Sequence, residues 1–294
     1  MKQIKLLFFL ASASVTGAFA QSNGLTDMSQ SRYAKMANTG IDAVHWTNGF
    51  WGERFNVFSG TSLQSMWNTW NTPEVSHGFR NFEIAAGVCK GEHWGPPFHD
   101  GDMYKWMEGV ASVYAVNKDP ELDKLMDNFI ACVVKAQRAD GYIHTPVVIE
   151  ELNKGIDSHT LADSQQQTVI GTKVGSEDEK GAFANRLNFE TYNLGHLMMA
   201  GIVHHRATGK TTLLDAAVKA TDFLCHFYET ASAELARNAI CPSHYMGVVE
   251  MYRATGNPRY LELSKNLIDI RGMVESATTN WYYYSFYFRQ LVEN

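Results

Sequence analysis

The sequence predicts an all-α protein built from stacked helical hairpins, and an internal repeat is the main reason. The segment YRATGNPRYL at 252–261 matches HRATGKTTLL at 205–214, an offset of 47 residues. A fainter copy, YAVNKDPEL at 114–122, lies 91 residues before the second, about two such periods. Repeats of this length are typical of helical hairpins, which stack because one hairpin cannot bury its apolar face alone.

Composition indicates a globular chain and excludes one class of partner. Hydrophobic residues make up 45% and charged residues 19% of the 294 residues, which allow one large domain or two small ones. The net charge of -6 offers no basic surface, so we expect no nucleic-acid partner. The 7 Trp, 13 Tyr and 16 Phe residues suit a core, and such side chains also line sugar sites.

The first 20 residues predict a signal peptide. Lys2 and Lys5 form a positive region, the run LLFFL begins an apolar region, and AFA precedes a cut after Ala20. A buried N-terminal helix is the alternative. Because no Cys follows the cut and no later apolar run could span a membrane, we expect a periplasmic or secreted protein without a membrane anchor.

The four cysteines favour free thiols. Export permits disulfides, but no pair has C-x-x-C spacing and there is no metal-site signature. Two of them lie among apolar residues in helical patterns, so we expect buried thiols. The four are Cys89, Cys132, Cys225 and Cys241.

The N-terminal third changes character twice. Residues 21–42 are small and polar and predict a flexible leader. The segments AVHW at 43–46 and GFW at 49–51 predict a short strand and a turn. Helical periodicity begins near Leu63 and strengthens after Ser76.

A helix with an apolar stripe is predicted over 102–116, and Asp119 and Pro120 then form the N-cap and first residue of the next helix. Residues 140–188 break this pattern, being rich in Gly, Ser, Asp and Gln, with β-like runs at 147–149 and 168–170. A long irregular insertion is usually functional or mobile, so we expect a loop or hairpin near the mouth of a site.

Two further hairpins follow the insertion. Apolar faces at 194–205 and 214–224 flank Gly209, which suits the left-handed position after a helix. A third hairpin repeats the pattern around Gly256. The segment TTNWYYYSFYF then fits no helix, so 277–294 is an atypical tail, either a terminal strand or out-of-frame sequence.

The densest polar and aromatic cluster is HWGPPFHDGDMYKW at 93–106. A Gly/Pro-rich turn that leads into a helix gathers side chains and N–H groups at one place. Asp100 and Asp102 could accept hydrogen bonds from the vicinal hydroxyls of a sugar. The alternative is that one of them only caps the helix.

Two later helix starts carry further candidates. Glu190 could bind ligand, or it could act only as a partner of the helix dipole. His196, His204 and His205 could be ligands, but lone helical histidines are more often core residues, and no H-E-x-x-H pattern indicates zinc. His244, in a first turn after Ser243, is the best single candidate for touching ligand, with a surface or capping role as the alternative.

Five segments, taken together and in order, resemble the beta-L-arabinofuranosidase family, glycoside hydrolase family 127. They span about residues 43–275 and are GFW at 49–51, FHDGDMYKWME at 98–108, QRADGYIHT at 137–145, ETYNLGH at 190–196 and LIDIRG at 267–272.

The resemblance implies an (α/α)6 toroid of helical hairpins that hydrolyses terminal sugars of plant glycans, followed by β-sandwich domains. Residues 43–276 would be the N-terminal part of that glycosidase domain, and the strand near 46–51 would pair with a later sandwich. The family mechanism uses a zinc-bound cysteine nucleophile, held by Glu and three Cys ligands, with a Glu as acid/base.

The resemblance carries over few residues. It places the Cys and Glu cluster beyond this chain, so no catalytic residue and no cofactor are assigned here, although zinc is expected for full-length members. His244 matches a sugar-contacting position. Phe189 stands where members have a substrate-binding His, and His144 stands where they have Asn or Asp, which leaves the sugar open.

We therefore expect a glycoside hydrolase of arabinofuranosidase type that acts on plant cell-wall glycans. About three and a half of six hairpins are recognisable, so a truncated, inactive fragment is expected. A non-catalytic carbohydrate-binding toroid fragment is the alternative. A terpene cyclase is disfavoured by the short DGD motif and the export signal. The oligomeric state is open.

Overall fold

The computed structural model describes residues 24–29, 31–156, 183, 189–230 and 243–272. The predicted signal peptide, the β-like run at 168–170, Cys241 and the 277–294 tail lie outside these residues. Within them the chain is helical and contains no strand, which confirms the all-α prediction. None of the described helices is long and apolar enough to cross a membrane.

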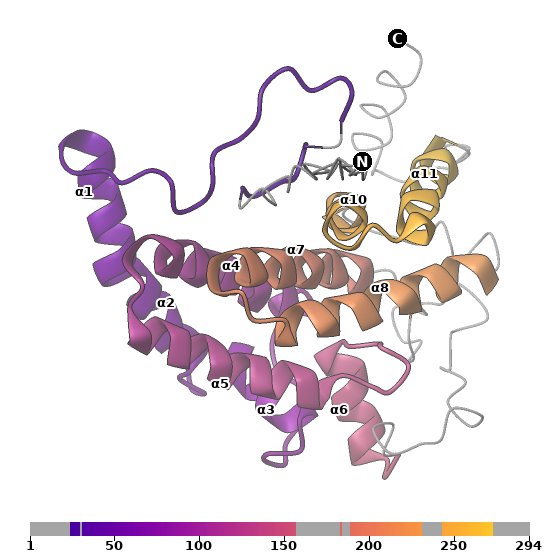
Figure 1. Ribbon diagram of the computed structural model, residues 1–294. Coiled ribbons are helices and arrows are strands. Elements are labelled where there is room, and N and C mark those ends of the chain that lie inside the picture. Colours follow the sequence, from indigo (N-terminus) through magenta and orange to yellow (C-terminus); the bar gives the residue numbers. More distant parts are fainter. Residues whose placement is uncertain (1–23, 30, 157–182, 184–188, 231–242, 273–294) are drawn as a thin grey trace, which may run out of the picture.

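The helices are short at first and longer from residue 99 onward, with the 9-residue helix Thr145–Asn153 as the exception (Figure 1). They are α1 (Gly49–Val57), the π-helix η1 (Phe58–Ser62), α2 (Leu63–Trp70), α3 (Gly78–Ala85), α4 (His99–Asn117), α5 (Pro120–Ala136), α6 (Thr145–Asn153), α7 (Glu190–Thr208), α8 (Thr212–Thr230), α10 (Ser243–Thr255) and α11 (Pro258–Gly272).

The long helices form two rows, as expected for the wall of a helical toroid. In one row α7 packs between α4 and α10, and in the other α8 packs between α5 and α11. Each helix of the first row is joined to one of the second, giving the hairpins α4–α5, α7–α8 and α10–α11. Figure 1 shows α5 below α4 and α7, with α10 and α11 at the right.

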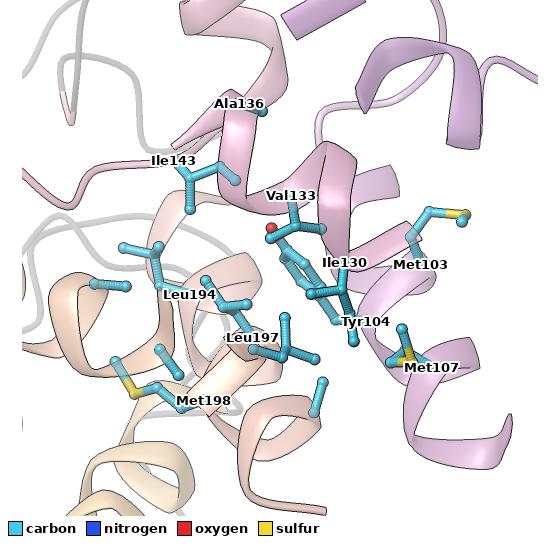
Figure 2. Close-up of a cluster of buried hydrophobic side chains, with 14 of the residues drawn as sticks. Met103, Tyr104, Met107, Ile130, Val133, Ala136, Ile143, Leu194, Leu197 and Met198 are labelled. Carbon is cyan, nitrogen blue, oxygen red and sulfur yellow. The ribbon is translucent and has the colours of Figure 1, made fainter. Parts of the chain in front are cut away.

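Apolar side chains from the two rows fill the space between them (Figure 2). Met103 and Met107 from α4, Val133 from α5, and Leu197 and Met198 from α7 all belong to this cluster. All five are buried. Because one hairpin cannot cover such residues by itself, the stack of hairpins is what stabilises the fold.

The predicted helix ends are confirmed. Asp119 caps α5 by accepting a hydrogen bond from the Glu121 N–H at 2.9 Å, and Pro120 is the first helical residue. Gly209 and Gly256 follow α7 and α10 with φ of 79° and 72°, the left-handed conformation that glycine adopts most readily.

Two predicted strand segments are wrong. Residues 43–48 form no regular element, and 49–51 begin α1. An isolated strand leaves its N–H and C=O groups unpaired, and the described residues supply no partner strand, whereas a helix pairs these groups internally. The β-like run at 147–149 lies in α6, where all three side chains are buried, so packing overrides their strand propensity.

The leader is held at two points in its described part. The Arg206 guanidinium in α7 donates to the Leu25 carbonyl at 2.6 Å, and the Asp27 N–H donates to the Glu250 carboxylate in α10 at 3.3 Å. Residues near 25–27 therefore lie against the first row of helices.

Candidate functional site

The first turns of α4, α7 and α10 lie side by side at one end of the first row. The Gly101 N–H in α4 donates to the Asn193 side chain in α7 at 2.8 Å. A Cβ at Gly195 in α7 would lie only 2.4 Å from the backbone nitrogen of His244 in α10. Glycine at these positions lets the helices approach closely, and the N-termini of three helices gather at this end.

Asp100 organises a buried network at this end. Its carboxylate accepts hydrogen bonds from the Thr145 N–H at 2.7 Å and from the Thr145 hydroxyl at 2.6 Å. His144 Nδ1 lies 3.5 Å from the same carboxylate. Burial by itself would raise the Asp100 pKa, but the nearby His144 and the two hydrogen bonds from Thr145 outweigh it and lower that pKa.

Neither Asp100 nor Asp102 caps α4, the helix in which both lie. The residue before α4 is Phe98, which makes no side-chain cap hydrogen bond. Asp100 instead accepts from Thr145, the first residue of α6, and so caps a helix that is remote in sequence. Asp102 pairs with Lys105 at 2.7 Å and is not part of the Asp100 network.

Asn193 in α7 forms hydrogen bonds to three other segments of the site. Its Oδ1 accepts from Gly101, which assigns the amide nitrogen as the donor to the Pro97 carbonyl at 2.9 Å. The same nitrogen lies 3.2 Å from His144 Nδ1. Because an amide nitrogen only donates, Nδ1 accepts, and a neutral His144 carries its proton on Nε2.

His144 is fully buried, and its Nε2 has no hydrogen-bond partner among the described residues. A buried donor that stays unpaired costs about 1–3 kcal/mol, so this nitrogen would gain from a hydrogen-bond acceptor on a ligand. His144 is therefore suited to donate to a hydroxyl of a bound ligand.

Glu190 lies in the first turn of α7 and is also buried. Its Oε1 accepts from the Tyr142 hydroxyl at 2.6 Å and from the Phe183 N–H at 2.7 Å. Burial raises the Glu190 pKa, although His144 and the two hydrogen bonds act in the opposite direction. The pKa of Tyr142 is raised well above its usual value by burial and by the Glu190 charge.

His244 is fully buried at the start of α10. Its ring is almost parallel to that of Tyr228, with an interplanar angle of 7° and centroids 6.4 Å apart. The Tyr245 ring meets it edge-on at 4.5 Å. The surface position is therefore excluded for His244, which lies one helix along the row from Asn193.

The structure thus brings Asp100, His144 and Glu190 together with His244 at one end of the array, and leaves Asp102 in a separate ion pair. Sequence reasoning did not single out Tyr142 or Thr145 as site residues. Both lie at the start of the expected irregular insertion. The signal for them was their place in the QRADGYIHT motif.

The described thiols do not suit nucleophilic attack or thiolate ligation. Burial raises the pKa of Cys89 and Cys132, and raises that of Cys225 to about 11. All three are free, as the sequence predicts, but the prediction that they are buried holds only for Cys225, since Cys89 and Cys132 are partly exposed. Both roles need the thiolate form, which a raised pKa disfavours.

Zinc, which the resemblance implies for full-length members, does not fit the described residues. No group of three or more His, Cys, Asp or Glu side chains among them could hold a metal ion. The described part of the chain therefore supplies no zinc chemistry.

Two rows of helices with buried polar groups at the first-turn end define the class of the protein by its fold, an all-α array of hairpins of the helical-toroid type. Residues 43–283 match the family model described as "Beta-L-arabinofuranosidase, GH127 catalytic domain". The chain belongs to this family, glycoside hydrolase family 127, as the motifs predicted.

Individual relatives agree. The non-reducing end beta-L-arabinofuranosidase of Bifidobacterium longum subsp. longum is 32% identical over 197 residues, which are 67% of this chain and 27% of that protein. A solved structure called a glycoside hydrolase is 73% identical, with a TM-score of 0.61, over 87% of this chain and 31% of its own.

A GH127 beta-L-arabinofuranosidase from Geobacillus stearothermophilus T6 is 28% identical, with a TM-score of 0.61. The match covers 85% of this chain and 35% of that structure. The chain therefore spans about a third, or slightly less, of the length of these relatives.

Proposed function

We propose that this chain provides the sugar-holding end of a beta-L-arabinofuranosidase-type glycoside hydrolase that acts on plant cell-wall glycans. The observation that carries the proposal is the meeting of three helix starts around His144, Glu190 and His244. Sugar rings present alternating donors and acceptors, and buried, fixed polar groups at a helix-row end match that chemistry.

The network supports distinct roles for its members. His144 Nε2 would donate to a sugar hydroxyl, and Glu190 would accept from one or, in its protonated form, donate to one. Asp100 would act indirectly, because its carboxylate is already bonded to Thr145 and lies near His144. Its role is to position His144 rather than to touch the sugar.

The thiols of the described residues favour a second function, which is to bind a sugar without cleaving its glycosidic bond. Burial raises the pKa of every thiol in these residues, and the nucleophile in such cleavage would be a thiolate, so these residues favour binding over bond cleavage. We propose that the 294-residue chain binds arabinofuranosides without hydrolysing them. The N-terminal motif supports export of the chain to the periplasm or beyond.

Two measurements on the purified chain test these proposals. Calorimetric titration with L-arabinose should show saturable binding that His244→Ala weakens about tenfold or more, since a lost hydrogen bond to a ligand costs about 1.5 kcal/mol. The exposed His226→Ala is the matched control and should bind as the unmodified chain does.

A turnover assay distinguishes hydrolysis from binding without hydrolysis. Aryl beta-L-arabinofuranosides with added zinc should release no aryl alcohol above the rate in buffer. Zinc-dependent release would contradict the binding-only proposal and support hydrolysis. Failure to bind L-arabinose or short arabinofuranosyl oligosaccharides would contradict both.

A further inference from the structure

Trp94 is one of several exposed aromatic residues, and its backbone is held by hydrogen bonds. Its exposed fraction is 50%, yet its N–H donates to Asn81 Oδ1 at 3.3 Å and its carbonyl accepts from Asn81 Nδ2 at 3.0 Å. Asn81 lies in α3 and is fully buried. The indole is therefore presented to solvent from a fixed support.

The ring itself is also supported. The His77 ring meets Trp94 edge-on, with centroids 5.0 Å apart and an interplanar angle of 66°. Edge-to-face contacts of this kind restrict a ring without covering both of its faces. An aromatic residue held in this way loses little conformational entropy when a ligand packs on it.

The loop that carries Trp94 is connected directly to the buried network. The Pro97 carbonyl accepts from Asn193, the residue that also contacts His144. Gly95 has a φ of 102°, and a Cβ there would lie 2.6 Å from the His99 ring, so the loop folds closely onto the start of α4. Trp94 is thus placed at the margin of the network.

Electrostatics agrees with this placement. Burial lowers the pKa of the neighbouring His93 to about 4, and the charges of Asp100 and His144 both act on that pKa. The residue next to Trp94 therefore lies within the electrostatic range of the site, while the indole remains exposed.

We propose that Trp94 is a stacking platform for a second sugar ring, which belongs to the same oligosaccharide as the sugar bound at the His144 and His244 end. This proposal rests on the proposed function and extends it, since it makes the preferred ligand an oligosaccharide rather than a single sugar. An indole face stacks on the C–H face of a sugar, and its N–H can bond a hydroxyl.

Titration of the 294-residue chain with two ligands tests the platform. The ligands are L-arabinose and a β-linked arabinofuranosyl trisaccharide. Trp94→Ala should weaken trisaccharide binding about tenfold, the loss of about 1.4 kcal/mol of stacking, and should change arabinose binding less than about twofold. Trp94→Phe, which keeps an aromatic face, should retain most of the trisaccharide affinity.

The matched control is Trp51→Ala. Trp51 is 67% exposed on α1, packs edge-on against Phe50, and within the described structure makes no hydrogen bond to Asn81 or Asn193. Its replacement should leave both affinities unchanged. Circular dichroism and a thermal melt show whether each variant remains folded.

The outcomes separate this proposal from the proposed function. Equal weakening of both ligands by Trp94→Ala, or no weakening of the trisaccharide, would overturn the platform alone. Arabinose binding by the unmodified chain would then still support the proposed function. If the unmodified chain bound neither sugar, both proposals would fail.

Discussion

Buried polar side chains differ sharply between the two ends of α7. At its start, Asn193 uses both its oxygen and its nitrogen, and Asp100 accepts two hydrogen bonds from Thr145. Near its other end, His204 is fully buried and neither ring nitrogen has a partner among the described residues. Hydrogen bonds fix the polar side chains at the start of α7 in one arrangement. His204, near the other end of the helix, tolerates burial only when its ring is uncharged.

His204 should make stability depend on pH. Burial lowers its pKa from 6.5 to about 4, with Lys210 acting in the same direction and Asp123 and Asp127 against it. Between those values the unfolded chain binds more protons than the folded one, so the free energy of unfolding falls as pH drops from 6.5 towards 4. The full effect is on the order of 3 kcal/mol.

Urea unfolding at several pH values measures this dependence. His204→Gln should reduce the slope of unfolding free energy against pH in that window, while the exposed His226→Gln should not. His93, whose pKa is also lowered to about 4, should contribute a second part of the slope. An unchanged slope in His204→Gln would contradict the assignment.

Close contacts between helices depend on where glycine stands in each one. Gly195 lies where α7 touches the backbone of α10 at Ser243 and His244. Gly247 in α10 faces the Gly195 carbonyl in return, 2.8 Å from where its own Cβ would stand. This pair of glycines sets the spacing of the two helices and hence the position of His244.

Gly195→Ala should therefore destabilise the fold and weaken sugar binding together. A methyl group at Gly195 would meet backbone atoms at 2.4–2.5 Å, and overpacking of this kind costs about 1–3 kcal/mol. Gly60→Ala is the matched control, because nothing lies within 4 Å of its Cβ position. It should stabilise the chain by about 0.5–1 kcal/mol in urea unfolding. Equal effects of the two changes would contradict the contact.

At the scale of the whole molecule, the leader is attached to the first row of helices by two hydrogen bonds. Arg206 and Glu250 are nearly buried and 3.5 Å apart, joining α7 to α10, and each also bonds the leader backbone. Arg253 forms a further ion pair with Glu250. The N-terminal segment is thereby tied to helices more than 180 residues away, at the opposite end of α7 from the Asp100 network.

Arg206→Met should release the leader. Removing one partner of a buried ion pair costs about 3–5 kcal/mol when the other charge is left unpaired, and the cost here should be smaller because Glu250 keeps its pair with Arg253. Hydrogen exchange and limited proteolysis should show faster exchange and new cleavage near residues 24–38. Arg259→Met is the control, since its pair with Glu229 is exposed and should contribute no more than about 1 kcal/mol. A leader as protected as before would contradict the anchor.

Much of the fold could be predicted because local rules decide it. The cap at Asp119 and the glycines at 209 and 256 act within one or two helical turns, and the repeat can be seen directly by comparing segments of the sequence. The strand predictions at 43–46 and 147–149 failed because strand propensity counts only where a partner strand exists. In the second case, burial in α6 outweighed it.

The sequence alone determined the helical class, the hairpin boundaries, the family and the short list of site residues. Tertiary structure alone decided which of those residues meet. Asp100 caps α6 instead of its own helix, Asp102 stays apart, and His144 is left with one unpaired nitrogen. These outcomes depend on contacts between helices about 45 to 90 residues apart in the chain, which no local pattern encodes.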